Sequence, residues 1–312
     1  MTSQCPRVSA LVVTRDRADS LERALAALNA QEHPSFEIVV VDNDSSDRTA
    51  DVVRQSGARY LHAHSAFGIG ACRRFAVEGA RGEIVAFCDD DCVPEPGWIA
   101  AFEREFARRP TLALAGGQVI NVGFAAEKEY KGLSRHLANG KCTFVNDPES
   151  AEYFGNMNLG LRRSAVLAVG NYDPSMNVME ELDLAERLRR AGYGVDYCPD
   201  AVLEHHHTGV SYKRRQRLRG PEWNRLSFFF AYHRPRSTRA WIRFARVETG
   251  LLAKDLRRSL RHLASRLRQK DPSGAMASLL RTASAVLARL SIPWILIRAA
   301  TRAELTTRAS EP

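Results

Sequence analysis

The strongest local signal in this chain is the stretch IVAFCDDDCVP, residues 84–94. Its first five residues are apolar and suit a buried strand, and Asp89, Asp90 and Asp91 follow at the carboxyl end of that strand. Three adjacent carboxylates repel one another, so the cluster is costly unless a cation neutralises it. Carboxylate oxygens suit Mg²⁺ or Mn²⁺, ions that share their ligand shell with phosphate oxygens. A solvated acidic turn is the alternative, because aspartate is common in turns.

The sequence around this stretch alternates between strand and helix patterns. Short apolar or β-branched runs indicate strands, and apolar residues at helical spacing, such as Leu21, Leu25 and Leu28, indicate helices. This alternation predicts an α/β domain with a mainly parallel sheet flanked by helices. The expected strands are Val8–Thr14, Phe36–Val41, Arg59–Ala63 and Ile84–Cys88, and the expected helices are Ala18–Ala30 (capped by Asp19 or Ser20), Asp47–Gln55 and Gly70–Ala80.

Polar residues stand where three of these strands end. Thr14, Asp42 and Asp89 each occupy or follow a strand's last position. In open sheets of this kind, ligands bind beyond the carboxyl ends of the strands. We therefore expect the three side chains to converge on one crevice.

A second acidic group opens a helix later in the chain. Glu180, Glu181 and Asp183 are close together, and Gly192 would end the helix. Carboxylates in a first helical turn favour the helix dipole, so helix capping is the alternative to a catalytic role.

Three consecutive histidines, His205, His206 and His207, follow an expected strand at Gly194–Tyr197 and an expected turn at residues 199–200. A neutral imidazole at this place could complete a divalent-metal shell or bind a phosphate. Exposed or structurally hydrogen-bonded histidines are the alternative.

The overall composition is that of a globular protein. The 312 residues are 45% hydrophobic and 26% charged, enough chain for one large domain and an appendage. The six cysteines fit neither a zinc site nor a disulfide framework, which indicates free thiols in a reducing compartment. The first apolar run, Val8–Val13, is too short for a secretory signal and is followed by Arg15 and Arg17. We expect a cytoplasmic protein.

The net charge of +9 is concentrated near the C-terminus. Residues 211–270 hold 18 lysines and arginines against three acids, and aromatic residues alternate with the arginines. The following apolar run, Ala275–Ile297, is interrupted by two arginines and a proline and is a poor transmembrane segment. A basic helical region of this kind can lie on an anionic membrane, here the inner face of the cell membrane, pack on the first domain, or form a homo-oligomer. Nucleic-acid binding would explain the charge but not the acidic cluster, so we expect no nucleic-acid partner.

Several further segments occur in a fixed order with the acidic cluster. They are Val8–Ala18, Val40–Thr49, Arg73 with Ala80–Phe87, Asp89–Asp91, Pro96–Ile99, Gly155–Leu159, Arg162–Ser164, Gly170–Asp173, Glu180–Gly192 and Pro199–His205. Together they resemble family-2 glycosyltransferases, over about residues 7–210. The resemblance implies the Rossmann-like GT-A fold and a nucleotide-sugar donor.

The resemblance also implies roles on the donor side. Thr14 and Asp42 would contact the nucleobase, and Arg73 would face the base or the diphosphate. Asp89 would hold the ribose, and Asp90 would lie beside it in the donor site.

The remaining roles concern the metal and the base. By resemblance, Asp91 would ligate Mn²⁺ or Mg²⁺, and His205 would contact the metal or a phosphate. Glu181 stands where the family usually has a catalytic aspartate, and Glu180 lies next to it, so either could be the base. Both residue types are carboxylic acids of similar pKa. Arg74 also departs from the family pattern, which commonly has asparagine there.

These observations predict an inverting glycosyltransferase that moves a hexosyl or deoxyhexosyl group from a UDP-, dTDP- or GDP-sugar to a hydroxyl. The acceptor would be a glycan, a lipid-linked glycan or a small molecule. The catalytic domain would span residues 1–215, and a helical, arginine-rich region would span residues 216–312. A catalytically inactive relative and a sugar nucleotidyltransferase are the alternatives, although the latter usually has a glycine-rich loop after its first strand.

Overall fold

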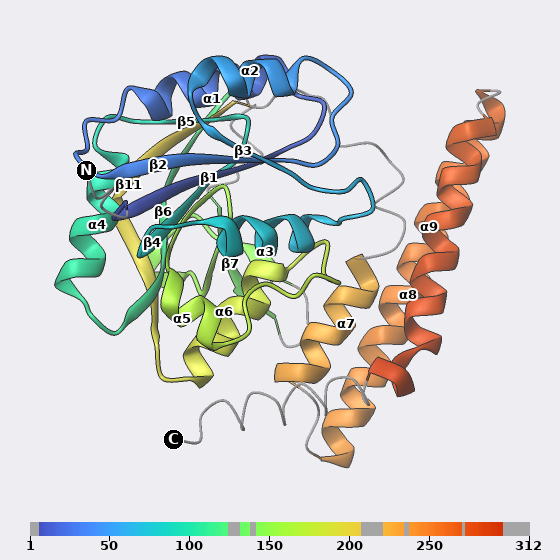
Figure 1. Ribbon diagram of the computed structural model, residues 1–312. Helices are drawn as coiled ribbons and strands as arrows, with labels where there is room; N and C mark the ends of the chain where they lie inside the picture. The colour runs from blue at the N-terminus through green and yellow to red at the C-terminus, as the bar shows by residue number, and fades with distance from the viewer. Residues whose placement is uncertain are drawn as a thin grey trace. The chain divides into compact units, whose positions relative to one another are not determined.

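The computed structural model describes residues 6–123, 132–137, 142–206, 221–233, 237–269 and 272–295. The chain divides into two compact units (Figure 1). The expected boundary after residue 215 lies outside the described residues, as do His207 and the arginines at positions 214, 215, 217 and 219. The first unit comprises Met1–Arg135, Cys142–Met176 and Glu180–Val210, and the second comprises His136–Lys141, Asn177–Met179 and Ser211–Pro312.

The first unit is built on one large sheet. Its strand order is β3-β2-β1-β4-β10-β6-β11-β5. β1 runs parallel to β2 and β4, β2 to β3, and β6 to β11, whereas β10 and β5 are antiparallel to their neighbours. The predicted mainly parallel sheet flanked by helices is confirmed (Figure 1). The strands are β1 (Val8–Thr14), β2 (Phe36–Asp42), β3 (Arg59–His62), β4 (Ile84–Cys88), β5 (Cys92–Pro94), β6 (Leu112–Val122), β10 (Asn158–Arg162) and β11 (Gly194–His206).

Helices and a small second sheet complete this unit. The helices are α1 (Ala18–Asn29), α2 (Thr49–Ser56), α3 (Ile69–Gly79), α4 (Trp98–Arg108), α5 (Arg163–Ala168) and α6 (Glu180–Arg190). The small sheet has the order β8-β7-β9 and consists of β7 (Leu133–His136), β8 (Cys142–Phe144) and β9 (Tyr153–Phe154).

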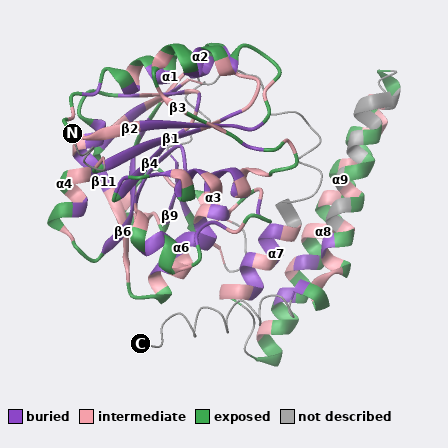
Figure 2. Ribbon diagram, in the orientation of Figure 1, coloured by how far each residue is buried: buried purple, intermediate pink, exposed green. Residues whose placement is uncertain are grey.

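The core forms because strand and helix each place apolar residues on one side. Alternate residues of β1, Val8, Ala10 and Val12, are buried in one cluster. β4 is buried along its whole length, as suits a strand in the middle of a sheet (Figure 2). The cluster also contains Leu21, Leu25 and Leu28 of α1 and Trp98 and Phe102 of α4.

The region after α6 differs from the prediction. The expected short strand at Gly194–Tyr197 and the turn at Pro199 are parts of one long strand, β11, which continues to His206. The register against β6 shifts between Cys198 and Val202, so residues 199–201 form an irregular bulge. Proline is tolerated there because a bulge needs no ladder hydrogen bond from it. The continuous strand brings His205 alongside β5.

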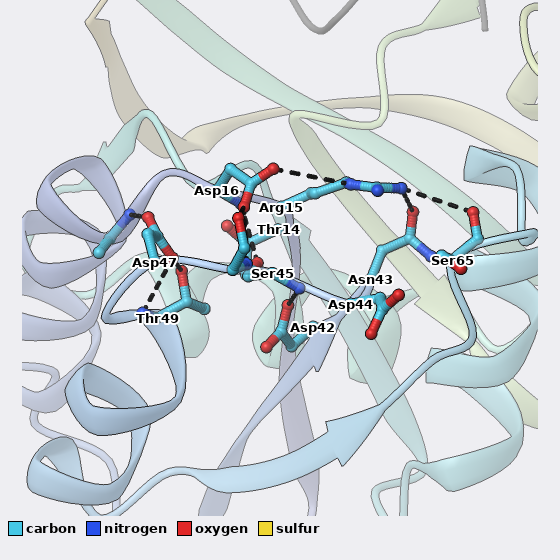
Figure 3. A network of polar contacts seen from close by, with 12 residues as sticks. Thr14, Arg15, Asp16, Asp42, Asn43, Asp44, Ser45, Asp47, Thr49 and Ser65 are labelled. Atoms are coloured by element: carbon cyan, nitrogen blue, oxygen red, sulfur yellow. Dashed lines mark hydrogen bonds and ion pairs between the residues drawn. The ribbon is translucent and has the colours of Figure 1, made fainter.

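The cap of α1 was also predicted wrongly. Neither Asp19 nor Ser20 is the N-cap residue, and Arg17 at that position makes no side-chain cap bond. Instead Asp47 accepts the backbone N–H of Ala18 at 3.0 Å from the loop that begins α2. The same carboxylate accepts the Thr49 N–H and hydroxyl, so one aspartate orders both helix starts (Figure 3).

The second unit is helical, as predicted for the C-terminal region. Its helices are α7 (Pro221–Tyr232), α8 (Thr238–Arg268) and α9 (Pro272–Leu290). Buried Glu248 of α8 accepts from Arg225 at 2.7 Å and from Arg289 at 3.2 Å. None of the helices in the described residues is long and apolar enough to cross a membrane. The small core contains Leu226, Phe229, Phe230, Phe244, Ala288 and Ile295.

Candidate active site

The acidic cluster lies between β4 and β5, next to the end of β1. Because β1 and β4 are parallel neighbours, the end of β1 meets the cluster, and the Thr14 hydroxyl donates to Asp90 Oδ2 at 2.7 Å. Arg17, three residues further on, lies between two carboxylates. Its Nη1 is 2.9 Å from Asp90 Oδ1, and its Nη2 is 2.7 Å from Asp91 Oδ2. Thr14 therefore meets the acidic cluster at Asp90, while the expectation that Thr14, Asp42 and Asp89 share one crevice stays a prediction.

The pKa values of the two aspartates that Arg17 bridges are shifted in opposite directions. Burial raises the pKa of Asp90 to about 7, although Arg17 and the Thr14 hydroxyl act against the rise. Burial also disfavours the charged form of Asp91, but the hydrogen bond from His205 and the Arg17 charge outweigh it. They lower the pKa of Asp91 to about 2. Asp91 therefore remains a carboxylate at any working pH.

His205 reaches the cluster through the pairing of β11 with β5. The register aligns His205 with Cys92, and His205 Nε2 lies 3.3 Å from Asp91 Oδ1. The backbone N–H of His206 donates to the Asp91 carbonyl at 2.8 Å, while its ring contacts Glu204 at 2.8 Å. Side chains alternate along a strand, so His205 and not His206 faces the aspartate.

The side chains around Asp91 fit a hard divalent cation. Ligand atoms of Asp91, Cys92 and His205 lie within 4.8 Å of one another. Two neighbouring ligands of an octahedral ion at about 2.1 Å would be about 3 Å apart, close to the Asp91–His205 separation. Burial raises the pKa of the Cys92 thiol well above its ordinary value, so Cys92 stays protonated and is a poor ligand. The carboxylate and the imidazole are the suitable pair.

Glu180 is held in place at the start of α6. Arg73, on α3, forms an ion pair with Glu180 Oε1 and lies 3.4 Å from Asp89 Oδ1. Asn156 Nδ2 donates to the same Glu180 oxygen at 3.3 Å, and the Tyr172 hydroxyl donates to Asn156 Oδ1 at 2.6 Å. Glu180 is 3% exposed. Arg73 thus connects the acidic cluster to the start of α6.

Glu181 has a different environment. Burial raises the pKa of Glu181 to about 8, and the charge of Glu180 adds to the rise, while Arg73 acts against it. A carboxyl with such a pKa accepts a proton near neutral pH, which is the property of a general base.

Asp42 is held by the protein's own donors. It ends β2 and is 2% exposed. The Ser45 N–H donates to Asp42 Oδ1 at 3.0 Å, and the Tyr60 hydroxyl donates to Oδ2 at 2.8 Å. Arg15 lies over this loop, 3.4 Å from Asn43 Oδ1 (Figure 3). The residues at the ends of β1 and β2 are therefore joined in one hydrogen-bonded network beside the acidic cluster.

A protein-family profile described as "Glycosyl transferase family 2" matches residues 9–167, just over half of the chain. This chain belongs to glycosyltransferase family 2. The resemblance seen in the sequence is thereby confirmed, and the chain is a glycosyltransferase.

Relatives of this family-2 chain carry matching descriptions. "Glycosyltransferase AglE" of Haloferax volcanii is 26% identical over 211 residues, 65% of this chain and 67% of the relative. "Pre-mycofactocin glycosyltransferase" of Mycobacterium tuberculosis is 27% identical over 206 residues, 64% of this chain and 43% of the relative. The match therefore spans less than half the length of the second relative.

Solved structures share the fold. The mannosyltransferase PcManGT from Pyrobaculum calidifontis, in complex with GDP-Man and Mn²⁺, has a TM-score of 0.55 at 20% identity. The match covers 96% of this chain and 88% of that one. S. aureus TarS, in complex with UDP-GlcNAc, has a TM-score of 0.51 at 16% identity, over 88% of this chain and 90% of that one. The predicted GT-A fold is confirmed.

Three residues of this candidate site have no role that follows from the sequence. Arg17 belongs to Val8–Ala18, the first segment that resembles the family. In the sequence it served only as a charged residue that argues against a secretory signal. Asn156 belongs to another matched segment, and Tyr172 to a third, without a stated partner. The position of Arg17, just after the strand that neighbours the acidic cluster, was the available signal. The Tyr172–Asn156–Glu180 chain joins parts of the sequence that no local pattern connects.

Proposed function

We propose that this enzyme is an inverting, metal-dependent glycosyltransferase that transfers a hexosyl or deoxyhexosyl group from a nucleoside-diphosphate sugar to a hydroxyl. One observation carries the proposal. Arg73 contacts both Asp89 of the acidic cluster and Glu180 at the start of α6. The acidic cluster, which would hold the cation, and the start of α6, which carries the candidate base Glu181, therefore meet at one arginine, and this supports transfer between a donor and an acceptor.

The donor would bind at the strand ends. Thr14 and Asp42 would lie toward the nucleobase, Asp89 and Asp90 toward the ribose, and Arg73 toward the base or the diphosphate. PcManGT binds GDP-Man and TarS binds UDP-GlcNAc, which supports a GDP- or UDP-sugar, with a dTDP-sugar as the third candidate. Ser45 and Tyr60 already bond Asp42, so its carboxylate, which can accept about four hydrogen bonds, would accept a base N–H in addition to these two donors.

Asp91 and His205 would hold the divalent cation, Mn²⁺ or Mg²⁺. The low pKa of Asp91 keeps its carboxylate available, and PcManGT was solved with Mn²⁺. A bound divalent cation supplies positive charge that stabilises a departing diphosphate.

Glu181 would be the general base that takes the acceptor's hydroxyl proton as the hydroxyl attacks the anomeric carbon. Glu180 would instead be a structural anchor, because Arg73 and Asn156 both bind it. A single displacement with one base inverts the configuration at the anomeric carbon.

The second unit would attach the enzyme to an anionic membrane surface, which favours a lipid-linked or membrane-associated acceptor. Exposed side chains on α9 recur every three or four residues and therefore share one helix face. Leu290, and Trp294 after α9, are each 72% exposed. The exposed apolar residues of this stripe are Met276, Leu279, Leu280, Leu287, Leu290 and Trp294.

Charge decides which partner fits this stripe. Among the described side chains of the second unit, many basic residues are exposed to solvent, whereas the acidic ones are buried or half-buried. A second copy would bring the same positive charge against itself, whereas anionic lipid attracts each nearby base by about 1 kcal/mol. The exposed bases of α8 are Arg239, Arg243, Arg246, Lys254, Arg257, Arg258, Arg261 and Arg268.

Vesicle sedimentation tests this attachment. The full chain should sediment with phosphatidylglycerol vesicles at low salt and be released as salt rises. Leu290→Glu should reduce sedimentation, whereas Phe144→Glu, which changes an exposed aromatic residue of the first unit, should not. Dimerisation in solution that Leu290→Glu abolishes, without vesicle binding, would assign the stripe to a homo-oligomer instead.

The catalytic proposal is tested by the anomer formed when water acts as acceptor. Proton NMR of wild type with Mn²⁺ and a donor that it accepts should show the inverted free sugar first, before mutarotation. Glu181→Gln should slow its formation by about 100-fold, the usual scale for losing a general base. Release of the retained anomer would contradict the single displacement.

A further inference from the structure

Arg17 occupies the acidic cluster in a way that the proposed reaction does not explain. Its guanidinium bonds Asp90 Oδ1 at 2.9 Å and Asp91 Oδ2 at 2.7 Å, and its side chain is 19% exposed. The other oxygens of these carboxylates face Thr14 Oγ1 at 2.7 Å and His205 Nε2 at 3.3 Å. All four oxygens therefore have protein partners.

The guanidinium is a permanent charge. Burial lowers the pKa of Arg17, but Asp90 and Asp91 raise it by more, so the side chain remains a cation. A divalent ion on Asp91 would place positive charge on the same carboxylate that Arg17 binds. Two cations this close repel strongly in a partly buried site.

Arg17 also borders a pocket. The pocket lies near the start of α1 and has a volume of about 540 Å³. The pocket is lined by Asp16, Arg17, Ala18, Asp19, Ser20, Arg23, Asp47 and Arg48.

We propose that Arg17 is the resident counter-cation of the acidic cluster and makes divalent-metal binding depend on a diphosphate. In the free protein it neutralises Asp90 and Asp91 and opposes entry of a bare ion. The negative charges of a nucleoside diphosphate offset that opposition and offer the guanidinium a new partner. The inference rests on the proposed metal site at Asp91, and Arg17 is a positioning residue in it.

Direct Mn²⁺ binding tests this role without any measurement of turnover. Titration of the full chain, with free Mn²⁺ followed by electron paramagnetic resonance, is compared with and without GDP or UDP, after the Mn²⁺ that each nucleotide binds without protein is subtracted. Wild type should bind Mn²⁺ weakly alone and about tenfold or more tightly with nucleotide. Arg17→Gln should bind Mn²⁺ alone about tenfold more tightly than wild type, because the competing charge is gone. A gain in affinity cannot result from damage to the fold.

Three variants make the test specific. Arg17→Lys keeps the charge and should bind like wild type. Arg23→Gln removes the same charge from an exposed residue of the same pocket and should also bind like wild type. Adding Asp91→Asn to Arg17→Gln should abolish the gain. If Arg17→Gln does not fold, Arg17→Gln with Asp90→Asn removes the second unpaired charge and should show the gain.

Unchanged or weaker Mn²⁺ binding by folded Arg17→Gln overturns the role of Arg17 while leaving the metal site intact. An equal gain in Mn²⁺ affinity by Arg23→Gln also overturns the role of Arg17, since any lost positive charge nearby would then have the same effect. If wild type binds no Mn²⁺ even with GDP or UDP, the metal site itself is wrong, and the role of Arg17 fails with it.

Discussion

Replacing Glu181 by glutamine should stabilise the folded protein at alkaline pH while it removes activity. Burial, together with the charge of Glu180, raises the pKa of Glu181 from 4.5 to about 8. The folded state therefore holds this proton more tightly than the unfolded chain does. Wild type should lose stability as the pH rises from about 4.5 to about 8, because ionisation then favours the unfolded state. Glutamine has no charge to gain and avoids this loss.

The size of the effect follows from the two pKa values. Each tenfold change in proton affinity corresponds to about 1.4 kcal/mol, so the ceiling above pH 8 is about 5 kcal/mol. Glu181 is only partly buried, and local rearrangement on ionisation reduces the figure. We expect Glu181→Gln to gain about 1–3 kcal/mol over wild type between about pH 5 and about pH 8.5.

Urea unfolding of wild type and both glutamine variants measures this gain. Glu180→Gln is the matched control, one residue earlier on the same helix. Its carboxylate pairs with buried Arg73, so its loss should destabilise the protein by about 1.5–3 kcal/mol at about pH 5. The loss should be smaller at about pH 8.5, because Glu181 ionises more easily without the neighbouring Glu180 charge. If the stability difference between Glu181→Gln and wild type does not change with pH, Glu181 is not a raised-pKa carboxyl, and its role as base loses its electrostatic support.

Three further outcomes are expected. The value of kcat/KM should rise with pH and level off above about 8, and Glu180→Gln should move that rise to lower pH, because its charge helps to raise the pKa of Glu181; a pH-independent rate argues against Glu181. Tyr172→Phe removes the hydroxyl that orients Asn156 and should lower kcat about tenfold with little change in KM, as steady-state kinetics would show. Gly70→Ala would force a Cβ against the backbone carbonyls of Met176 and Asp173 and should lower the free energy of unfolding by about 1–3 kcal/mol. Gly79→Ala, whose Cβ meets only the flexible end of Leu61, is its control, and equal losses would contradict the packing argument.

The meeting of Thr14 with the acidic cluster was predictable from sequence, because neighbouring parallel strands end at the same edge of a sheet. The strands and helices up to β4 were predictable because each carries its own periodic pattern. Asp42 lies at the expected strand end, yet its bonds to Ser45 and Tyr60 depend on a turn and a neighbouring strand that no motif specifies.

Contacts between side chains that lie far apart in the sequence could not be predicted from local sequence patterns. Arg73 binds Glu180 across 107 residues, and Arg17 binds Asp91 across 74, so neither partner is visible in either sequence neighbourhood. Pro199 resembles a turn residue, and only the pairing of β11 with β6 shows that a bulge accommodates it within β11. The cap of α1 was equally hidden, because Asp47 accepts the first backbone N–H of that helix from another loop.

Metal-dependent transfer is measured most directly by nucleoside-diphosphate release from a panel of UDP-, dTDP- and GDP-sugars, with Mn²⁺ and with chelator. Wild type should turn over at least one donor only when the cation is present, and Asp91→Asn should reduce that turnover by about 100-fold or more while keeping its fold. Donor binding without release would indicate an inactive relative, and formation of a nucleotide sugar from nucleoside triphosphate and sugar phosphate would indicate a nucleotidyltransferase. Equal turnover in excess chelator, or by Asp91→Asn, would contradict a catalytic cation at Asp91.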